Sequence, residues 1–164
     1  MNKPKIEIQK DKTDHIIELV GLVALAGLLI FPLLYYWDLP GNIPQHYGIN
    51  GQPDAFGSKG MIWLLPLVGL VMYSGLTVLN RYPHAFNYPV RITEENALRQ
   101  YIIATKLVRS LKAFVVSLFC YLNYSTIQIA MGKQSGLGTA FLLILIVGMF
   151  GVIGFFIWWA YKNK

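Results

Sequence analysis

Residues 19–37 read LVGLVALAGLLIFPLLYYW, a run without Asp, Glu, Lys, Arg or His. A helix needs about 20 residues to cross the hydrocarbon core of a bilayer, so this run is long enough to be a membrane span. Three further uncharged, apolar runs follow at residues 61–80, 113–131 and 139–161. We therefore predict an all-α integral membrane protein whose four transmembrane helices form a single polytopic domain over residues 1–164.

The composition excludes the common soluble classes. Of the 164 residues, 55% are hydrophobic and only 13% are charged. Soluble domains carry about 25% charged residues, and a small domain has a large surface to cover with them. A soluble enzyme and a disordered chain are therefore excluded. Cys120 is the single cysteine, which also excludes a disulfide scaffold.

The net charge of +6 arises from basic residues that flank the apolar runs. Nucleic-acid binders gather Lys and Arg on an exposed groove or arm, so we expect the partner to be the lipid bilayer and not a nucleic acid. Twelve of the 14 basic residues lie in the N-terminal tail, the second loop or the C-terminal tail; Lys59 and Lys133 occupy the other two loops. The positive-inside rule then predicts a multi-pass protein of the cytoplasmic (inner) membrane with both termini in the cytoplasm.

The first loop, residues 38–60, reads DLPGNIPQHYGINGQPDAFGSKG and contains three prolines and five glycines. This composition predicts tight turns instead of a regular helix or strand, with turn pairs at Asn50–Gly51 and Pro53–Asp54. Such turns bring residues eight apart within reach, so we expect an ordered outer cap in which His46 lies near Asp54. The candidate recognition residues of this loop are Pro44, His46, Asn50, Gly51, Pro53, Asp54 and Lys59.

Two interpretations of the polar groups in this loop stay open. His46 with Asp54 and Asp38 is a possible metal-ligand set, but a zinc site needs at least three protein ligands, and turn Asp and Asn commonly bond to nearby backbone. We favour the turn network, and we assign no metal and no cofactor. The alternative, a membrane enzyme that uses His46 and Asp54, rests on the same two residues.

The third apolar run carries a polar stripe, Ser117, Tyr121, Tyr124 and Gln128, spaced to share one helical face. Polar groups are costly against lipid, so we expect this stripe to face the bundle interior. Interhelical hydrogen bonding is the favoured role, and a groove for a polar ligand or peptide is the alternative. The spans themselves hold no ionisable residue of the kind that an intramembrane protease or a proton-coupled pump requires.

A helix start is predicted upstream of this run. Thr93 resembles an N-cap, and the acids Glu94 and Glu95 suit the positive end of a helix. A helix that begins near Glu94 would enter the membrane unbroken. It would carry a basic amphipathic turn, with Arg99 and Lys106, along the inner leaflet.

The loops also resemble a known family. Pro44-x-His46, Gly51-x-Pro53-Asp54 and Gly57-Ser58-Lys59 stand between the first two spans, and Tyr82-Pro83-His84, Asn87-Tyr88-Pro89-Val90 and Thr93-Glu94-Glu95-Asn96 follow the second. From about Tyr36 to Asn123 the chain is similar to the uncharacterised membrane domain at the N-terminal end of bacterial sporulation-delay toxin immunity proteins. That resemblance makes His84, Asn87, Pro89, Glu95 and Asn96 a candidate cytoplasmic motif.

The resemblance implies a multi-span bacterial inner-membrane protein. In the immunity members it also implies protection against a membrane-active peptide toxin, sometimes with recruitment of a transcriptional repressor to the membrane. Those proteins continue with further spans, whereas this sequence has four. We therefore expect a non-enzymatic immunity-like or sensor-like protein. The alternative from another class is a small accessory subunit of a larger membrane transporter or enzyme complex.

Overall fold

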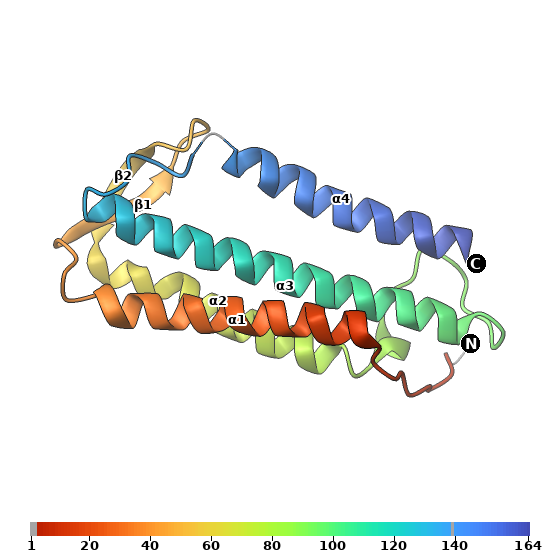
Figure 1. Ribbon diagram of the computed structural model, residues 1–164. Helices are drawn as coiled ribbons and strands as arrows, with labels where there is room; N and C mark the ends of the chain where they lie inside the picture. The colour runs from red at the N-terminus through yellow and green to blue at the C-terminus, as the bar shows by residue number, and fades with distance from the viewer. Residues whose placement is uncertain (1–2, 139) are drawn as a thin grey trace.

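The computed structural model describes residues 3–138 and 140–164 (Figure 1). In chain order, its elements are α1 (Lys12–Tyr35), β1 (Asn42–Tyr47), β2 (Pro53–Ser58), the 3₁₀ helix η1 (Lys59–Trp63), α2 (Leu64–Leu79), the 3₁₀ helix η2 (Pro83–Ala85), α3 (Ala97–Ala130) and α4 (Phe141–Lys162). The start of the fourth predicted span, residue 139, lies outside the described residues.

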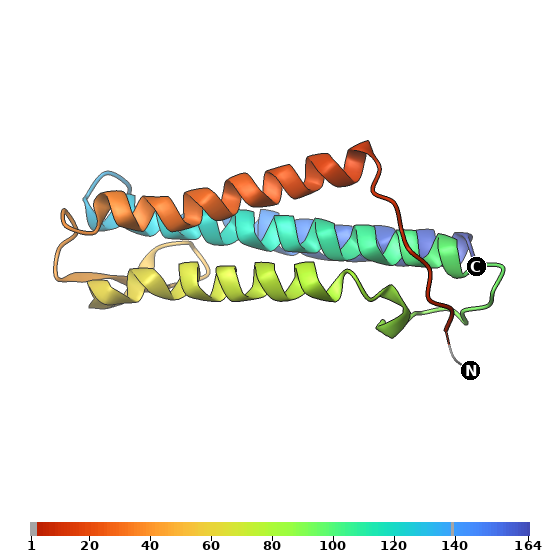
Figure 2. The same ribbon diagram turned by 90° about the horizontal axis from the view of Figure 1, so that it is seen from below.

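The four long helices run side by side, with α3 at the centre. Helices α1 and α2 pack on one side of α3, and α4 packs on the other (Figures 1 and 2). The β1–β2 hairpin and the α3–α4 connection lie at one end of the bundle, which we call the hairpin end. The described ends of the chain lie at the opposite end, which we call the termini end.

Three segments are long and apolar enough to cross a membrane: Lys12–Tyr35, Lys59–Leu79 and Phe141–Lys162. They coincide with the first, second and fourth predicted spans. Their large apolar side chains point away from the bundle, as Leu19, Leu67 and Val147 illustrate with about 60% of their surface exposed. An apolar outer face is typical of helices whose surroundings are lipid. Helix α3 contains the third predicted span, but it is more polar and carries more buried residues than any other element.

Apolar contacts hold the helices together at successive levels along α3. Val116 packs with Leu25 and Leu28 of α1 at mid-length, and Ile127 packs with Ile43 and Ile62 at the hairpin end. Gly69 of α2 permits the close approach of α1, because a Cβ there would lie 2.6 Å from Leu28 Cδ2. Because lipid is as apolar as these side chains, close packing between the helices, and not removal from water, stabilises these contacts.

The first loop corrects the all-α prediction, because it contains a two-stranded antiparallel sheet. Proline is tolerated in edge strands and at the first residue of a strand. Both strands of a two-stranded sheet are edge strands, which accommodates Pro44, and Pro53 is the first residue of β2. Pro53 begins β2, so the prediction of a turn at Pro53–Asp54 is wrong. The turn at Asn50–Gly51 is present: Gly51 has φ +74°, and its N–H donates to the carbonyl of Gly48.

Helix α3 begins three residues later than predicted. The Thr93 side chain accepts from the N–H of Asn96 at 3.3 Å, while the Asn96 side chain accepts from the N–H of Thr93 at 2.9 Å. This reciprocal pair has the hydrogen bonds of a capping box at Thr93, as an N-cap there requires, although the assigned helix begins only after Asn96. From Ala97 the helix then runs without interruption through the third predicted span.

Candidate functional site

The hairpin is fixed to the ends of α1 and α3. Tyr47 Oη lies 2.7 Å from Thr126 Oγ1 of α3, and Ile43 is fully buried beneath the hairpin. Lys59 Nζ lies 3.3 Å from the carbonyl oxygens of both Tyr36 and Leu39, just beyond the C-terminus of α1. A cation suits that end of a helix, whose last carbonyls lack helical partners. The hairpin is therefore a docked element and not a loose linker.

The α3–α4 connection secures the tip of the hairpin. The N–H of Leu137 donates to the carbonyl of Gly51 at 2.8 Å, and the Leu137 side chain is buried. A Cβ on Gly136 would lie 2.7 Å from the same Gly51 oxygen, so this approach requires glycine. Tyr121 Oη donates to the Leu137 carbonyl at 2.6 Å and ties the connection back to α3.

The predicted proximity of His46 and Asp54 is present. His46 Nδ1 lies 2.6 Å from Asp54 Oδ1 across the two strands, and their side chains are 70% and 52% exposed. Asn50 accepts from the backbone N–H of Gln52 at 3.1 Å and shapes the turn. Among the described residues no third His, Cys, Asp or Glu joins the pair to complete a metal-ligand set. The docked hairpin therefore holds one basic and one acidic side chain in fixed positions at its exposed surface.

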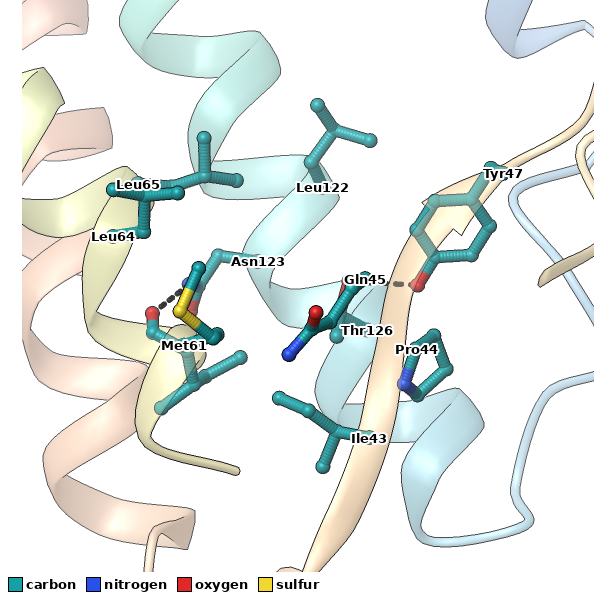
Figure 3. A pocket seen from close by; sticks show the side chains of 11 residues that line it. Ile43, Pro44, Gln45, Tyr47, Met61, Leu64, Leu65, Leu122, Asn123 and Thr126 are labelled. Carbon is teal, nitrogen blue, oxygen red and sulfur yellow. Dashed lines mark hydrogen bonds between the residues drawn. The ribbon is translucent and has the colours of Figure 1, made fainter. Parts of the chain in front are cut away.

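A pocket of about 230 Å³ lies beneath the hairpin, between β1, the start of α2 and α3 (Figure 3). Its walls are mostly apolar and include Ile43, Pro44, Met61, Ile62, Leu65 and Leu122. Asn123 also lines the pocket and is 1% exposed. Its Nδ2 donates to the Ile62 carbonyl at 2.8 Å, whereas its Oδ1 is buried without a hydrogen-bond partner.

The prediction for the polar stripe of α3 is wrong. Tyr121 and Tyr124 are exposed, Ser117 and Gln128 are half-buried, and Ser117 donates to the carbonyl of Ala113 in its own helix. Tyr121 and Ser117 instead border an open, largely apolar groove of about 520 Å³ between α3 and α4. The interior polar residues of this part of α3 are Asn123, Ser125 and Thr126. The hairpin and α2 cover that face, and sequence periodicity does not reveal such covering.

The residues of the predicted cytoplasmic motif lie apart at the termini end. The His84 ring lies edge-on to Tyr82 in η2, and Glu95 is exposed. Asn96 Nδ2 donates to the Arg91 carbonyl at 3.0 Å. Asn87 and Pro89 border a small cavity of about 70 Å³. These contacts support the loop before α3 and do not converge on one site.

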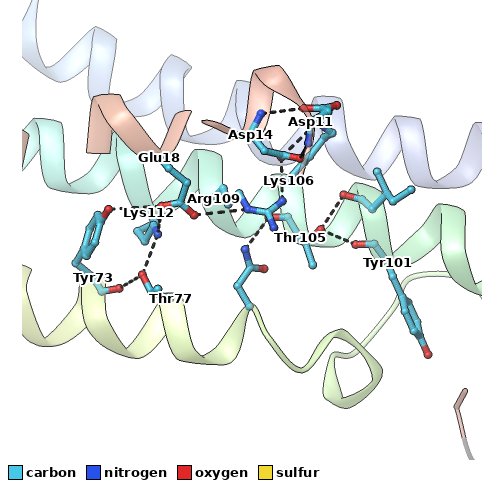
Figure 4. A network of polar contacts seen from close by, with 12 residues as sticks. Asp11, Asp14, Glu18, Tyr73, Thr77, Tyr101, Thr105, Lys106, Arg109 and Lys112 are labelled. Atoms are coloured by element: carbon cyan, nitrogen blue, oxygen red, sulfur yellow. Dashed lines mark hydrogen bonds and ion pairs between the residues drawn. The ribbon is translucent and has the colours of Figure 1, made fainter. Parts of the chain in front are cut away.

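The most concentrated charge in the described part of the chain was not predicted as a site. Three acids of the α1 segment, Asp11, Asp14 and Glu18, face three bases of α3, Lys106, Arg109 and Lys112 (Figure 4). We call this set the ion-pair ladder. The shortest distances are 2.7 Å for Lys106–Asp11, 2.9 Å for Arg109–Asp14 and 2.7 Å for Lys112–Glu18.

The ladder is buried and electrically balanced. Asp14, Arg109 and Lys112 are each less than 5% exposed. Lys112 also donates to Thr77 of α2 at 2.9 Å, so the ladder joins three helices. At its open end, the hydrogen bond from Lys106 lowers the pKa of Asp11 from 3.8 to about 2. Lys106 is thus paired inside the bundle, which corrects the prediction of a basic turn exposed along the membrane surface.

A signal for the ladder is present in the sequence. Positions 11, 14 and 18 share one helical face, as do positions 106, 109 and 112, and the two sets have opposite charge. The acids precede the first uncharged run and the bases precede the third. The acids were left in the tail before the first predicted span. The bases fell within the helix predicted from Glu94 but were assigned to the membrane surface, so the two sets were not paired.

Parts of the chain are similar in sequence to uncharacterised proteins. A family described as "Domain of unknown function (DUF1648)" matches residues 22–70, which cover most of α1, the hairpin and the start of α2. An "Uncharacterized protein" of Archaeoglobus fulgidus is 36% identical over 78 residues, a match covering 43% of each chain. The chain thus spans less than half of that archaeal relative. No solved structure matches.

Proposed function

We propose that this chain is a non-enzymatic, four-span membrane protein that recognises a membrane-active peptide at its hairpin end, as an immunity or sensor protein. The observation that carries the proposal is the docked hairpin above a pocket at the helix ends. A rigid support for an exposed loop is the usual arrangement of a recognition surface. The His46–Asp54 pair supplies polar contacts, and the pocket supplies an apolar one.

The character of the site favours binding over catalysis. The pocket walls are apolar or carry neutral amide and hydroxyl groups, and among the described residues no His, Asp, Glu or Lys lines the pocket to activate them as a general base. His46 and Asp54 are the titratable pair, and they lie on the outward surface of the hairpin. A general base needs a substrate held within hydrogen-bond reach, and neither His46 nor Asp54 is among the residues that line the pockets beneath and beside the hairpin.

The separation of the two polar regions supports a role other than transport. The ion-pair ladder lies near the start of α1 and α3, while Asn123 and Thr126 lie near the hairpin, where Thr126 contacts Tyr47 and Asn123 contacts Ile62. Between them, Leu25, Leu28 and Val116 form a buried apolar cluster. A proton or ion relay needs a chain of polar groups across the membrane, and this cluster interrupts one.

The orientation we propose places the hairpin end outside the cytoplasm and both termini inside, with α3 as the fourth span. Helix α3 runs beside the three apolar helices along the bundle, and its charges are paired within the ladder (Figure 1). Without the three ladder bases, nine basic residues remain on the termini side against Lys59 and Lys133 on the other. The positive-inside rule therefore still predicts the same orientation.

A second candidate function is that of an accessory subunit. Helix α4 contacts α3 and leaves most of its surface open; Leu143, Val147 and Phe150 are about 60% exposed or more. Such a face accepts lipid or the helix of a larger membrane complex. A neighbouring gene for a peptide toxin or repressor would favour the first function, and neighbouring transporter genes would favour the second.

The first function is tested by challenging a susceptible bacterium with purified sporulation-delay toxin peptide and following membrane depolarisation with a potential-sensitive dye. We expect expression of the chain to raise the toxin concentration that depolarises half of the cells. His46→Ala and Asp54→Ala should reduce this protection at an unchanged level of protein in the membrane. His84→Ala and Glu95→Ala, at the termini end, are the matched controls. Equal sensitivity with and without the chain would contradict immunity to this peptide.

A further inference from the structure

We infer that the free edge of β2 binds an extended peptide segment as a third strand of the hairpin sheet, through the backbone groups of Phe56 and Ser58. That the segment belongs to a membrane-active peptide rests on the proposed function. That this edge accepts an extended strand rests on the register of the hairpin, the exposure of β2 and the direction of its strands.

The register of the hairpin shows which backbone groups of β2 point away from β1. Pro44 lies opposite Phe56, and proline has no N–H with which to exchange a pair of hydrogen bonds. The N–H of Lys59 donates to the carbonyl of Gly41 at 3.0 Å, which fits the same register. Because bonded and non-bonded pairs alternate along an antiparallel ladder, Phe56 and Ser58 both belong to non-bonded pairs. Their N–H and C=O groups are therefore directed outward.

These outward groups are available to a partner strand. In the part of the chain that the structure describes, no backbone group outside the hairpin bonds to Phe56 or Ser58. Gln45 Nε2 lies 3.4 Å from the Ser58 carbonyl oxygen, a long hydrogen bond that a partner strand can replace. An edge strand with unpaired N–H and C=O groups is a template for pairing with another chain.

The edge also lacks the charged side chains that commonly protect edge strands from such pairing. From Ala55 to Ser58 there is no charged residue, and Phe56 is 62% exposed. Lys59, the next residue, is turned back to the carbonyl oxygens of Tyr36 and Leu39. A partner strand can therefore approach β2 without displacing a charge. An apolar side chain on that strand would gain a cross-strand contact with the Phe56 ring.

The direction of the strands favours a peptide over a second copy of the chain as the partner. Both strands run obliquely to the long helices (Figure 1). Two β2 strands paired antiparallel are related by a two-fold axis perpendicular to them, so this axis would be oblique to the helices. Two copies that span one membrane need an axis along the membrane normal. A single extended peptide meets no such restriction, and strand addition to a free sheet edge is a recurring mode of peptide recognition.

The test uses the capped peptide KTVTVTK and an analogue that is N-methylated at its three central residues and cannot donate from them to a ladder. The chain is labelled with ¹⁵N-phenylalanine and ¹⁵N-glycine in lipid nanodiscs, and its amide hydrogen exchange is followed by NMR. We expect saturating KTVTVTK to slow exchange of the Phe56 amide about tenfold or more, because that amide becomes hydrogen-bonded. The Gly57 amide, which points toward β1, should change little. The methylated analogue should leave both amides unchanged.

A matched pair of variants separates the backbone of Phe56 from its ring. Phe56→Pro removes the outward N–H, and proline suits this position because Pro44 already stands opposite it in an edge strand. Phe56→Ala removes the ring and keeps the N–H. By anisotropy of fluorescein-labelled KTVTVTK, Phe56→Pro should bind about fivefold more weakly than wild type, because one hydrogen bond is lost, and Phe56→Ala should lose less. The comparison of the two peptides on the wild type decides the question even if Phe56→Pro fails to fold.

Several outcomes would overturn the inference. Unchanged exchange of the Phe56 amide with KTVTVTK would show that the edge accepts no strand, and equal slowing by both peptides would show contact without pairing. Slow exchange without peptide, increasing with the number of chains in each nanodisc, would assign the edge to a second copy. Peptide binding by a chain that gives no toxin protection would reject the proposed function alone. Full toxin protection by a folded Phe56→Pro variant would reject the edge as the toxin site alone.

Discussion

Asp14 and Arg109 show how the ladder couples α1 to α3. Asp14 Oδ1 lies 2.9 Å from Arg109 Nη1 and 3.3 Å from Lys106 Nζ, in a site where Asp14 is 2% exposed. Desolvation of the two charges offsets much of their attraction. The network therefore contributes to specificity, because α1 and α3 can bring all three pairs together in one register only.

Removing one member of this pair should destabilise the chain more than removing both. We expect Arg109→Leu to lower the free energy of unfolding by about 3–5 kcal/mol, because Asp14 keeps its burial and loses its main partner. The double variant Asp14→Leu/Arg109→Leu should recover much of that loss. SDS titration in mixed micelles measures all three proteins. A double variant less stable than Arg109→Leu would show that the pair is net stabilising.

We expect the stability of the folded chain to depend on pH through Asp11, at the open end of the ladder. Its pKa is lowered from 3.8 to about 2, first of all by the hydrogen bond from Lys106. A carboxyl whose pKa is depressed by folding stabilises the folded state above its unfolded pKa, and this contribution is lost as the pH falls through the folded pKa. Thermal unfolding in detergent should show this component constant above about pH 5 and lost between pH 4 and 2.

The variant Asp11→Asn should abolish that component and leave the rest of the pH profile unchanged. Glu94→Gln, an exposed acid before α3, is the matched control and should change nothing in this range. An identical loss of thermal stability between pH 4 and 2 in wild type and Asp11→Asn would assign the effect to another group.

At the scale of elements, the hairpin and the α3–α4 connection should behave as one unit. Gly136→Ala places a Cβ 2.7 Å from the Gly51 carbonyl and must move the connection away from the hairpin. We expect the amide of Leu137 to exchange faster with solvent and the stability to fall by about 1 kcal/mol, the cost of one hydrogen bond. Hydrogen exchange measures the first effect. Gly151→Ala, where nothing lies within 4 Å of the added Cβ, should leave the Leu137 amide protected.

The apolar helices were predictable because their signal is local. Residues 19–37 carry no charge, and α1 covers nearly all of them. The hairpin was missed because Pro44 and Pro53 argue against a strand, and only the pairing of β1 with β2 shows that both positions tolerate proline. The proximity of His46 and Asp54 was predictable, since a turn at Gly51 brings residues on either side together.

Contacts between distant segments account for the errors at the candidate sites. The Ser117 stripe has helical periodicity, but periodicity states which residues share a face and not which element covers that face. The face with Asn123 and Thr126 is covered instead, because the hairpin docks there through Tyr47. The ladder likewise joins residues more than 90 positions apart. In the sequence, its six charged residues therefore look like two unrelated groups that flank the first and third apolar runs.

At the scale of the molecule, charge and apolar surface are divided along the bundle. The described chain ends lie at the termini end (Figure 2), together with the ladder and most basic residues outside it. Apolar side chains cover the outside between the two ends of the bundle. The hairpin end carries the exposed His46–Asp54 pair. In a membrane with its basic side in the cytoplasm, this division places the ladder near the inner leaflet and the hairpin on the outer surface.

Cysteine labelling in a Cys120→Ser background tests this arrangement. Exposed positions are available at both ends: Ser58 and Ser135 at the hairpin end, Glu95 and Lys164 at the termini end. We expect an impermeant maleimide to label cysteines at Ser58 and Ser135 in intact bacterial cells. Cysteines at Glu95 and Lys164 should react only after the inner membrane is opened. All four should react equally in detergent, which controls for side-chain exposure.

The labelling pattern also decides whether α3 crosses the bilayer. If α3 lay along one surface, Glu95 and Ser135 would be on the same side and would react together. Opposite accessibility of these two sites requires the helix between them to span the membrane, and its three ladder bases would then lie toward the inner side. Labelling of the cysteine at position 95 in intact cells would show the opposite orientation. The basic termini end would then lie outside the cell, contrary to the positive-inside rule.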